Sequence, residues 1–235
     1  MLYLVASFVQ VKERPVLFII GDSTVKNGNT EQWGWGSFLG EHLDSTKIKV
    51  ENHAIGGRSS RTFITEGRWE RILAVLKPGD YVLIQFGHND GGPLGDTSRA
   101  RGSIKGIGDE SKEIYNPIRK QQEVVYTYGA YLRKYVADAK SKGAIPIICS
   151  PVPRDNWKEG KVNRANNNYG KWAKEVAAAT GTFFIDLNNK IADKYDAMGP
   201  EKAASLFIGD HTHTSKEGAM LNATIVAESL KQLIK

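Results

Sequence analysis

Five short runs of apolar, mostly β-branched residues recur along the chain, separated by longer segments of mixed polarity. Polar and apolar positions do not alternate within the runs, which is typical of parallel strands buried on both faces of a sheet. The runs are Val16–Ile20, Ile48–Asn52, Tyr81–Phe86, Ile145–Cys149 and Thr182–Ile185. The pattern predicts a five-stranded parallel sheet.

Helical patterns occupy the segments between these runs. We expect helices around Trp35–Leu43, before Pro78–Gly79, at Val124–Ser141 and at Ala165–Thr180, and a last helix that begins with the capping box Thr214-x-x-Glu217. Strands that alternate with helices predict an α/β fold with helices on both faces of the sheet. One long, polar, Gly-rich segment, Gly91–Gln122, fits neither pattern, and we interpret it as a wall of the active site.

The length of 235 residues indicates one domain, over residues 15–235. Residues 1–14 form an N-terminal extension that is either the remnant of a signal peptide or an added edge strand, because Met1–Val9 is apolar but lacks a basic region and a clear cleavage site. No run of about 18 apolar residues is present, so no membrane span is expected. The single cysteine, Cys149, lies in an apolar run and is interpreted as a buried hydrophobic residue.

The formal net charge of +6 favours polyanions as partners. Lysine and arginine are scattered among 26 acidic residues, without a basic run or a nucleic-acid-binding motif. Nucleic acid is therefore disfavoured, and an acidic carbohydrate remains open.

Polar residues stand where the predicted strands end. Gly21–Thr24, Ala54–Ser59 and Gly87–Asp90 follow the first three strands, and Asp210–His213 precedes the last helix. Ligands of open parallel sheets bind beyond the carboxyl ends of the strands, so we expect these segments to converge on one site.

These segments contain the groups that acyl transfer needs: a hydroxyl nucleophile, a base, an orienting carboxylate and oxyanion donors. Ser23 supplies the hydroxyl, His213 can take its proton, and Asp210 can hold the other ring nitrogen. The backbone N–H groups of Ser23 and Gly57 and the amide of Asn89 are available for the oxyanion. The sequence therefore predicts a serine esterase that forms an acyl-enzyme on Ser23.

Each signal has a plainer explanation when taken alone. Gly-Asp-Ser and Gly-Gly are common in turns, and the Asp210–His213 cluster could bind zinc, although the spacing indicates no third ligand. His211 is an alternative base. The agreement of four signals at strand ends and a helix start favours the catalytic interpretation, without metal or cofactor.

The same segments resemble the four sequence blocks of the SGNH (GDSL-type) hydrolases across residues 15–235. Longer strings, among them Gly34–Gly36, Glu66–Arg68 and Phe86–Gly91, resemble the rhamnogalacturonan acetylesterases within that superfamily. Thr24 departs from the Leu of GDSL-named members. The resemblance implies a flavodoxin-like three-layer α/β/α fold, His213 rather than His211 as base, and removal of O-acetyl groups from pectic rhamnogalacturonan. It also implies an extracellular or periplasmic location, although no complete signal peptide is visible.

Five side chains near the expected site are candidates for binding such a substrate: Trp33, Arg58, His88, Arg154 and Trp157. Exposed indoles can stack on sugar rings, and arginine binds carboxylates in a bidentate manner. Each could also be structural; His88 could simply hold the loop that carries Asn89.

Two other functions remain as alternatives. A lipase or thioesterase would use the same triad but would need an apolar acyl channel. A flavin- or nucleotide-binding module could use Gly21–Thr30 as a phosphate loop, but this segment lacks both the Walker Lys-[Ser/Thr] pair and the dinucleotide glycine spacing. The sequence indicates no oligomeric state.

Overall fold

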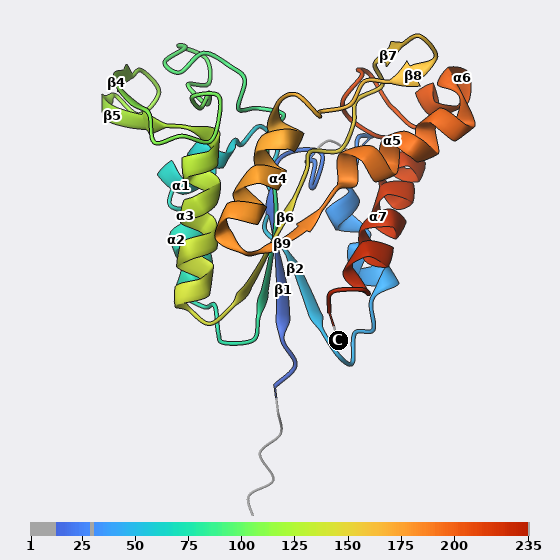
Figure 1. The fold of residues 1–235 in the computed structure, drawn as a ribbon, viewed down its shortest axis with the longest axis horizontal. Helices are drawn as coiled ribbons and strands as arrows, with labels where there is room; N and C mark the ends of the chain where they lie inside the picture. Colours follow the sequence, from blue (N-terminus) through green and yellow to red (C-terminus); the bar gives the residue numbers. More distant parts are fainter. Residues whose placement is uncertain (1–12, 29–30, 235) are drawn as a thin grey trace, which may run out of the picture.

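A five-stranded parallel sheet forms the centre of the computed structural model, which describes residues 13–28 and 31–234 (Figure 1). The strand order is β2-β1-β3-β6-β9, and all neighbouring strands are parallel. The strands are β1 (Val16–Gly21), β2 (Lys49–Asn52), β3 (Tyr81–Gln85), β6 (Ile145–Cys149) and β9 (Phe183–Ile185). The predicted sheet is confirmed, with each strand end within one residue of its expected position. Most of the extension predicted at residues 1–14 lies outside the described residues.

Helices cover both faces of the sheet and complete three layers (Figure 1). One face carries α1 (Ser60–Thr65), α2 (Arg68–Leu73), α3 (Tyr128–Ser141) and α4 (Tyr169–Thr180), and the other carries α5 (Leu187–Met198), α6 (Pro200–Ala204), α7 (Lys216–Leu230) and the 3₁₀ turns η1 (Trp35–Ser37) and η2 (Leu39–His42). Successive residues of β1 enter opposite cores, because Leu17 and Ile19 belong to one apolar cluster and Phe18 and Ile20 to the other. The absence of polar–apolar alternation in the sequence thus reflects burial on both faces.

Several helix boundaries differ from the predicted ones. The segment around Trp35–Leu43 forms two 3₁₀ turns instead of one helix, and a side chain at Gly36 would lie 2.6 Å from the amide of Asn52, so this segment packs directly on the sheet edge. The helix predicted from Val124 begins at Tyr128, because Thr127 is its N-cap and accepts a hydrogen bond from the backbone N–H of Ala130. The helix predicted from residue 165 begins at 169, and the last helix is capped by residue 215 rather than 214.

The long segment Gly91–Gln122 is ordered by one buried ion pair. Its second half forms an antiparallel hairpin of β4 (Ser111–Asn116) and β5 (Gln121–Tyr126). Arg61 of α1 is fully buried and lies 2.6 Å from a carboxylate oxygen of Glu123 in β5. The same guanidinium donates to the backbone carbonyls of Leu94 and Gly102, at 2.7 and 2.8 Å. These contacts tie the segment to α1, in the helix layer on one face of the sheet.

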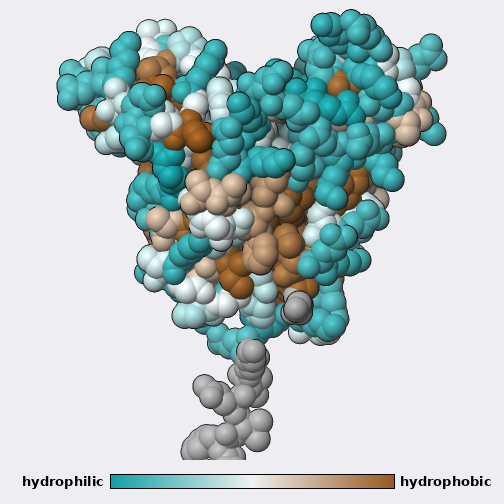
Figure 2. All heavy atoms as spheres, viewed as in Figure 1, coloured by the Kyte–Doolittle hydropathy of each residue, from teal (hydrophilic) through white to brown (hydrophobic). Residues whose placement is uncertain are grey.

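Two lobes rise above the carboxyl ends of the strands. One is the β4–β5 hairpin with its preceding loop, and the other contains the short hairpin of β7 (Trp157–Lys158) and β8 (Lys161–Val162) (Figure 1). Figure 2 shows that both lobes are predominantly hydrophilic, whereas apolar side chains gather lower on this face. None of the helices in residues 13–28 and 31–234 is long and apolar enough to cross a bilayer.

Candidate active site

Ser23 stands in the tight turn that follows β1. Asp22 organises this turn: its backbone carbonyl accepts from Val25 and Lys26, and its side chain accepts from both the backbone N–H and the hydroxyl of Thr24. The Ser23 side chain is presented at the sheet edge between the two lobes. Gly56, from the loop after β2, faces it, and a side chain there would lie 3.6 Å from the Ser23 Cβ. A small residue at position 56 leaves the hydroxyl accessible.

The structure brings Ser23, His213 and Asp210 into one line of hydrogen bonds, although 190 residues separate the hydroxyl from the imidazole. The Ser23 Oγ lies 2.8 Å from the His213 Nε2, and the His213 Nδ1 lies 2.6 Å from an Asp210 carboxylate oxygen. A carboxylate accepts from the Nδ1–H, so the Nε2 is left unprotonated and can take the hydroxyl proton. This is the arrangement of a nucleophile, a base and an orienting group.

The other carboxylate oxygen of Asp210 is held by the backbone of its own loop. It accepts from the N–H groups of Thr212 and His213, at 2.7 and 2.8 Å. Partial burial alone would raise the pKa of Asp210, but the hydrogen bonds from the His213 side chain and from both backbone groups hold the pKa below its ordinary value. Asp210 is therefore ionised at neutral pH.

Three candidate oxyanion donors belong to residues that line the same cavity, Ser23, Gly57 and Asn89. Among the described residues, no acceptor binds the backbone N–H of Ser23 or of Gly57. One N–H of the Asn89 side chain donates to the carbonyl of Arg58 at 2.9 Å, which leaves the second for a ligand. Gly57 has a φ of +78°, in the left-handed region that favours glycine. These positions can stabilise an oxyanion that forms next to Ser23.

A buried polar network supports the turn from below. The indole N–H of Trp35 donates to Gln85, the Gln85 amide donates to the Thr24 hydroxyl at 2.7 Å, and that hydroxyl donates to Asp22. Sequence analysis missed Gln85, because a lone glutamine at the end of an apolar strand carries no pattern. Its two hydrogen bonds fix the residue directly after the nucleophile.

His88 closes the same network from the loop after β3. Its Nδ1 lies 3.3 Å from an Asp22 carboxylate oxygen, and its Nε2 lies 3.0 Å from the carbonyl of Val152. Burial alone would raise the pKa of Asp22, but His88 and the hydrogen bonds from Thr24 hold the pKa below its ordinary value. An ionised carboxylate and a carbonyl both accept hydrogen bonds, so each ring nitrogen of His88 faces an acceptor. His88 thus connects the loop after β3 to Asp22 and to the segment that follows β6.

Asp90, in the same loop as His88, is the second buried carboxyl group near the site, after Asp22. It accepts from the backbone and hydroxyl of Ser60 and from the hydroxyl of Ser103 at 3.0 Å. Burial raises the pKa of Asp90 to about 6, although these hydrogen bonds lower it. The carboxyl group thereby connects the loop that carries Asn89 with α1 and with the wall of the site.

A cavity of about 660 Å³, here called the active cavity, opens at the hydroxyl. Ser23, Gly57, Asn89 and His213 line it. Four arginines, Arg58, Arg99, Arg101 and Arg154, also line it, together with one acidic residue, Glu66. Of these arginines, Arg58 forms an ion pair with Glu66 at 3.0 Å. The active cavity therefore has a strongly positive lining.

Arg99 and Arg101 belong to the segment interpreted from sequence as a wall, but their proximity to Ser23 was not predicted. Asp96 shapes this part of the wall by accepting from the backbone N–H groups of Ser98, Arg99 and Ala100. Ala100 is buried with a φ of +42°, so the chain turns there. Both neighbouring arginines consequently line the active cavity.

The candidate substrate-binding residues occupy different places. His88, Arg58 and Arg154 line the active cavity. Trp157 lies outside it, in a neighbouring depression of about 620 Å³ that Asp210 also lines, with its indole N–H on Asp155 at 2.7 Å. Trp33 lines none of these cavities, and its ring packs on Phe38 with centroids 5.3 Å apart.

The alternative base and the metal interpretation gain no support from the geometry. The His211 side chain is 79% exposed, and its Nδ1 lies 3.8 Å from Asp155 rather than near the hydroxyl of Ser23. Within the described part of the chain, no three His, Cys, Asp or Glu side chains gather as metal ligands would.

Comparisons with known proteins agree with this geometry. Residues 19–221 match the GDSL-like lipase/acylhydrolase family. A rhamnogalacturonan acetylesterase of Emericella nidulans is 36% identical over 208 residues, which cover 88% of this chain and 81% of the relative. The rhamnogalacturonan acetylesterase RhgT of Bacillus subtilis is 32% identical over 240 residues, covering 94% and 92% of the two chains.

A solved structure shares the fold. The protein YxiM of Bacillus subtilis superposes with a TM-score of 0.76 at 28% identity, over 94% of this chain. This chain spans 57% of the length of that structure.

Proposed function

This chain belongs to the GDSL-like lipase/acylhydrolase family and is an ester hydrolase, and from that premise we propose that it removes O-acetyl groups from an acidic plant polysaccharide, rhamnogalacturonan, through an acetyl-enzyme on Ser23. The observation that carries the substrate class is the lining of the active cavity, which contains four arginines and one glutamate. Arginine binds carboxylates with charge-assisted, bidentate hydrogen bonds. A polymer that contains uronic acids presents carboxylates near its esters, and the names of the two acetylesterase relatives give such a polymer, rhamnogalacturonan, as their substrate.

In the proposed mechanism, the Ser23 Oγ attacks the acetyl carbonyl carbon while its proton passes to the His213 Nε2. The carbonyl oxygen becomes an oxyanion and accepts from the N–H groups of Ser23 and Gly57 and from the Asn89 amide. The tetrahedral intermediate then expels the sugar hydroxyl, which takes the proton from His213. Water attacks the acetyl-enzyme with the same base, releases acetate and restores the hydroxyl. Asp210 holds the imidazole in the required tautomer throughout.

The lining of the active cavity disfavours a long-chain acyl ester. Ile118, at the tip of the β4–β5 hairpin, is the one aliphatic side chain among its described lining residues. A lipase needs a continuous apolar surface for its acyl chain, because burial of methylene groups supplies the binding energy. An acetyl group needs no such channel.

Acetate release from three substrates tests the proposal. Acetylated rhamnogalacturonan should be deacetylated with a higher kcat/KM than acetylated xylan, a neutral polymer, or 4-nitrophenyl acetate. Raising the salt concentration should raise KM for the charged polymer alone, because salt screens exposed charges beyond about 8–10 Å. Ser23→Ala should reduce kcat by about 10³–10⁶-fold on all three substrates. Preference for a long-chain ester, or no acetate from rhamnogalacturonan at any salt concentration, would refute the proposed substrate.

A further inference from the structure

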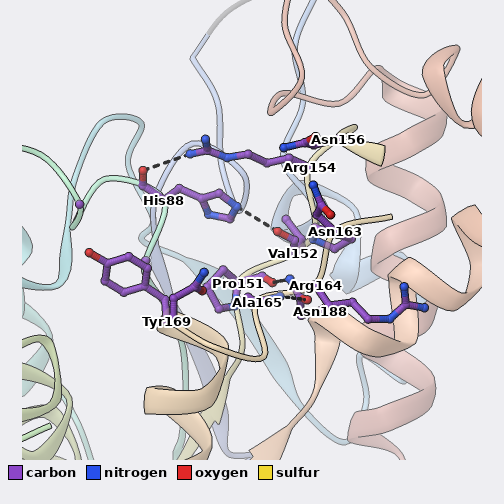
Figure 3. Close-up of a pocket in the computed structure, with 14 residues that line it drawn as sticks. His88, Pro151, Val152, Arg154, Asn156, Asn163, Arg164, Ala165, Tyr169 and Asn188 are labelled. Atoms are coloured by element: carbon purple, nitrogen blue, oxygen red, sulfur yellow. Dashed lines mark hydrogen bonds between the residues drawn. The ribbon is translucent and has the colours of Figure 1, made fainter. Parts of the chain in front are cut away.

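A second cavity lies beside the active cavity and shares His88 with it; Figure 3 shows its lining residues. We call it the side cavity, and its volume is about 360 Å³, within the range of about 300–1,000 Å³ that is typical of small-molecule sites. His88 and Arg154 line both cavities. The two cavities therefore adjoin at these two side chains.

The side cavity has no acidic side chain among its described lining residues. Two arginines line it, but they differ in their partners. Arg164 is bound to Asp193 at 2.5 Å and Asp196 at 2.8 Å, so its charge is compensated. Arg154 makes no ion pair with any described residue and reaches only the carbonyl of His88, at 3.4 Å. Arg154 is thus the available cation of this cavity.

Three asparagine side chains add neutral hydrogen-bonding groups. Asn156, Asn163 and Asn168 line the side cavity, and no described residue hydrogen-bonds to their side-chain amides. Figure 3 shows Arg154 extended over the ring of His88, with Asn156 and Asn163 near the base of its side chain. An amide offers both a donor and an acceptor, which suits the hydroxyl groups of a sugar.

The remaining walls are apolar or rigid. Pro151, Pro153 and the ring of Tyr169 enclose the cavity. Tyr169 is fixed by edge-on contacts with Tyr128 and Trp172, at centroid distances of 5.0 and 4.9 Å. Such walls can pack against the C–H groups of a pyranose ring with little loss of side-chain freedom. The cavity is thus preformed and offers both polar and apolar contacts.

From these features we infer that the side cavity is a subsite for a carboxylate-bearing sugar residue, the neighbour of the acetylated residue along the chain. Arg154 binds its carboxylate, and Asn163 and Asn168 bind its hydroxyl groups. This inference rests on the proposed function, since it assumes a polymer that contains uronic acids. Arg154 was already a candidate from the sequence, whereas Asn163 and Asn168 were not.

Substrates of different length separate this subsite from the active cavity. An acetylated monosaccharide fills only the active cavity, whereas an acetylated disaccharide with a neighbouring uronate reaches both. The quantity to measure is the ratio of kcat/KM for the disaccharide to kcat/KM for the monosaccharide. Asn163→Ala should lower this ratio about 3- to 10-fold, as expected for one neutral hydrogen bond. Asn167→Ala is the matched control, because Asn167 is exposed on the same loop and does not line the cavity.

Chemical reduction of the uronate carboxyl group tests the role of Arg154. Arg154→Gln should lower kcat/KM for the native disaccharide about 10- to 100-fold, as expected for hydrogen bonds to a charged group. With the carboxyl-reduced disaccharide, the same substitution should have a much smaller effect. Equal effects on the native and reduced substrates would show that Arg154 does not bind that carboxylate.

Two results distinguish failure of this inference from failure of the proposed function. If the wild-type protein deacetylates the disaccharide but Asn163→Ala and Asn167→Ala behave alike, the subsite is refuted and the proposed function stands. If no acetate is released from any acidic substrate, the proposed function fails. Calorimetry with an unacetylated rhamnogalacturonan oligosaccharide then tests the side cavity alone. Binding weakened by Asn163→Ala but not by Asn167→Ala supports the subsite, and equal binding overturns it.

Discussion

Replacement of Asp210 by asparagine tests the catalytic geometry more sharply than removal of the nucleophile. One carboxylate oxygen of Asp210 accepts from two backbone N–H groups, and the other accepts from the His213 Nδ1 at 2.6 Å. In Asp210→Asn, only the amide oxygen can take the first position, because two donors point at it. The amide nitrogen is then forced to face the imidazole. It donates to the Nδ1, so the ring proton moves to the Nε2, and His213 can no longer accept the proton of Ser23.

The expected loss follows from this change of tautomer. A serine hydrolase with the wrong tautomer of its base loses about 10⁴-fold in kcat, which corresponds to about 5 kcal/mol of activation free energy. Asp210→Ala should lose less, although it is the larger deletion. The Asp210 side chain is 44% exposed, so water can enter the vacated position and accept from the Nδ1–H. We therefore expect the order wild type, Asp210→Ala, Asp210→Asn in decreasing kcat.

The assay is the initial rate of 4-nitrophenyl acetate hydrolysis, with circular dichroism to confirm that both variants fold. This ester avoids any contribution from sugar binding. An Asp210→Asn variant that retains a tenth of the wild-type turnover would refute Asp210 as the orienting group. An Asp210→Ala variant slower than Asp210→Asn would refute the tautomer argument but leave the residue in the site.

Three further predictions concern Asn89, Asp90 and Arg61. Asn89→Ala should lower kcat about 10²–10³-fold with little change in KM, because its amide is proposed to act on the oxyanion; steady-state kinetics that show only a raised KM would contradict this role. Burial raises the pKa of Asp90 to about 6, so the folded protein binds the proton of this carboxyl group more tightly than the unfolded chain does. The ionised Asp90 therefore lowers the stability of the fold: the loss is absent below about pH 4 and complete above about pH 6. Urea denaturation should therefore show the stability of Asp90→Asn relative to wild type rising by about 3 kcal/mol between pH 4 and pH 7, whereas a pH-independent difference would exclude the shift. Arg61→Met should cost about 3–5 kcal/mol of unfolding free energy, since it leaves Glu123 as a buried, unpaired charge; a loss below 1 kcal/mol would mean that water reaches that carboxylate.

Much of the fold was predictable because burial on both faces forces whole strands to be apolar. The five strands were located within one residue by that criterion alone. Helix starts were less predictable, since hydrophobic spacing does not identify competing partners. Val124 and Tyr128 have helical spacing, yet Val124 pairs with Glu113 in the β4–β5 hairpin. A tertiary contact outside the segment decided its structure.

The residues of the candidate site also fall into a group that the sequence could locate and a group that it could not. Ser23, Asn89 and Asp210 could be located because each lies at a strand end or before a helix, where the topology of a parallel sheet gathers side chains. Arg99 and Asn163 could not be located, because their segments are irregular. The position of Arg99 depends on the turn around Asp96 and on the buried ion pair of Arg61 and Glu123. The position of Asn163 depends on the short β7–β8 hairpin above the sheet. Residues on the scaffold were predictable, and residues on the walls were not.

The interpretation of Trp33 as a substrate contact shows how scaffold and site are joined. The backbone N–H of Trp33 donates to the carbonyl of Thr214 at 2.9 Å, and the Thr214 hydroxyl donates back to the carbonyl of Trp33 at 2.8 Å. Gln32 donates to Ile208 at 2.8 Å, on the other side of the same loop. The segment that begins nine residues after Ser23 thus contacts both sides of the loop that carries His213. No strand carries that loop, so its position relative to Ser23 depends on these hydrogen bonds together with others, such as that from the Ile208 N–H to the His213 carbonyl at 3.0 Å. Trp33 thus contacts the loop that carries His213 through its backbone, and its ring packs on Phe38.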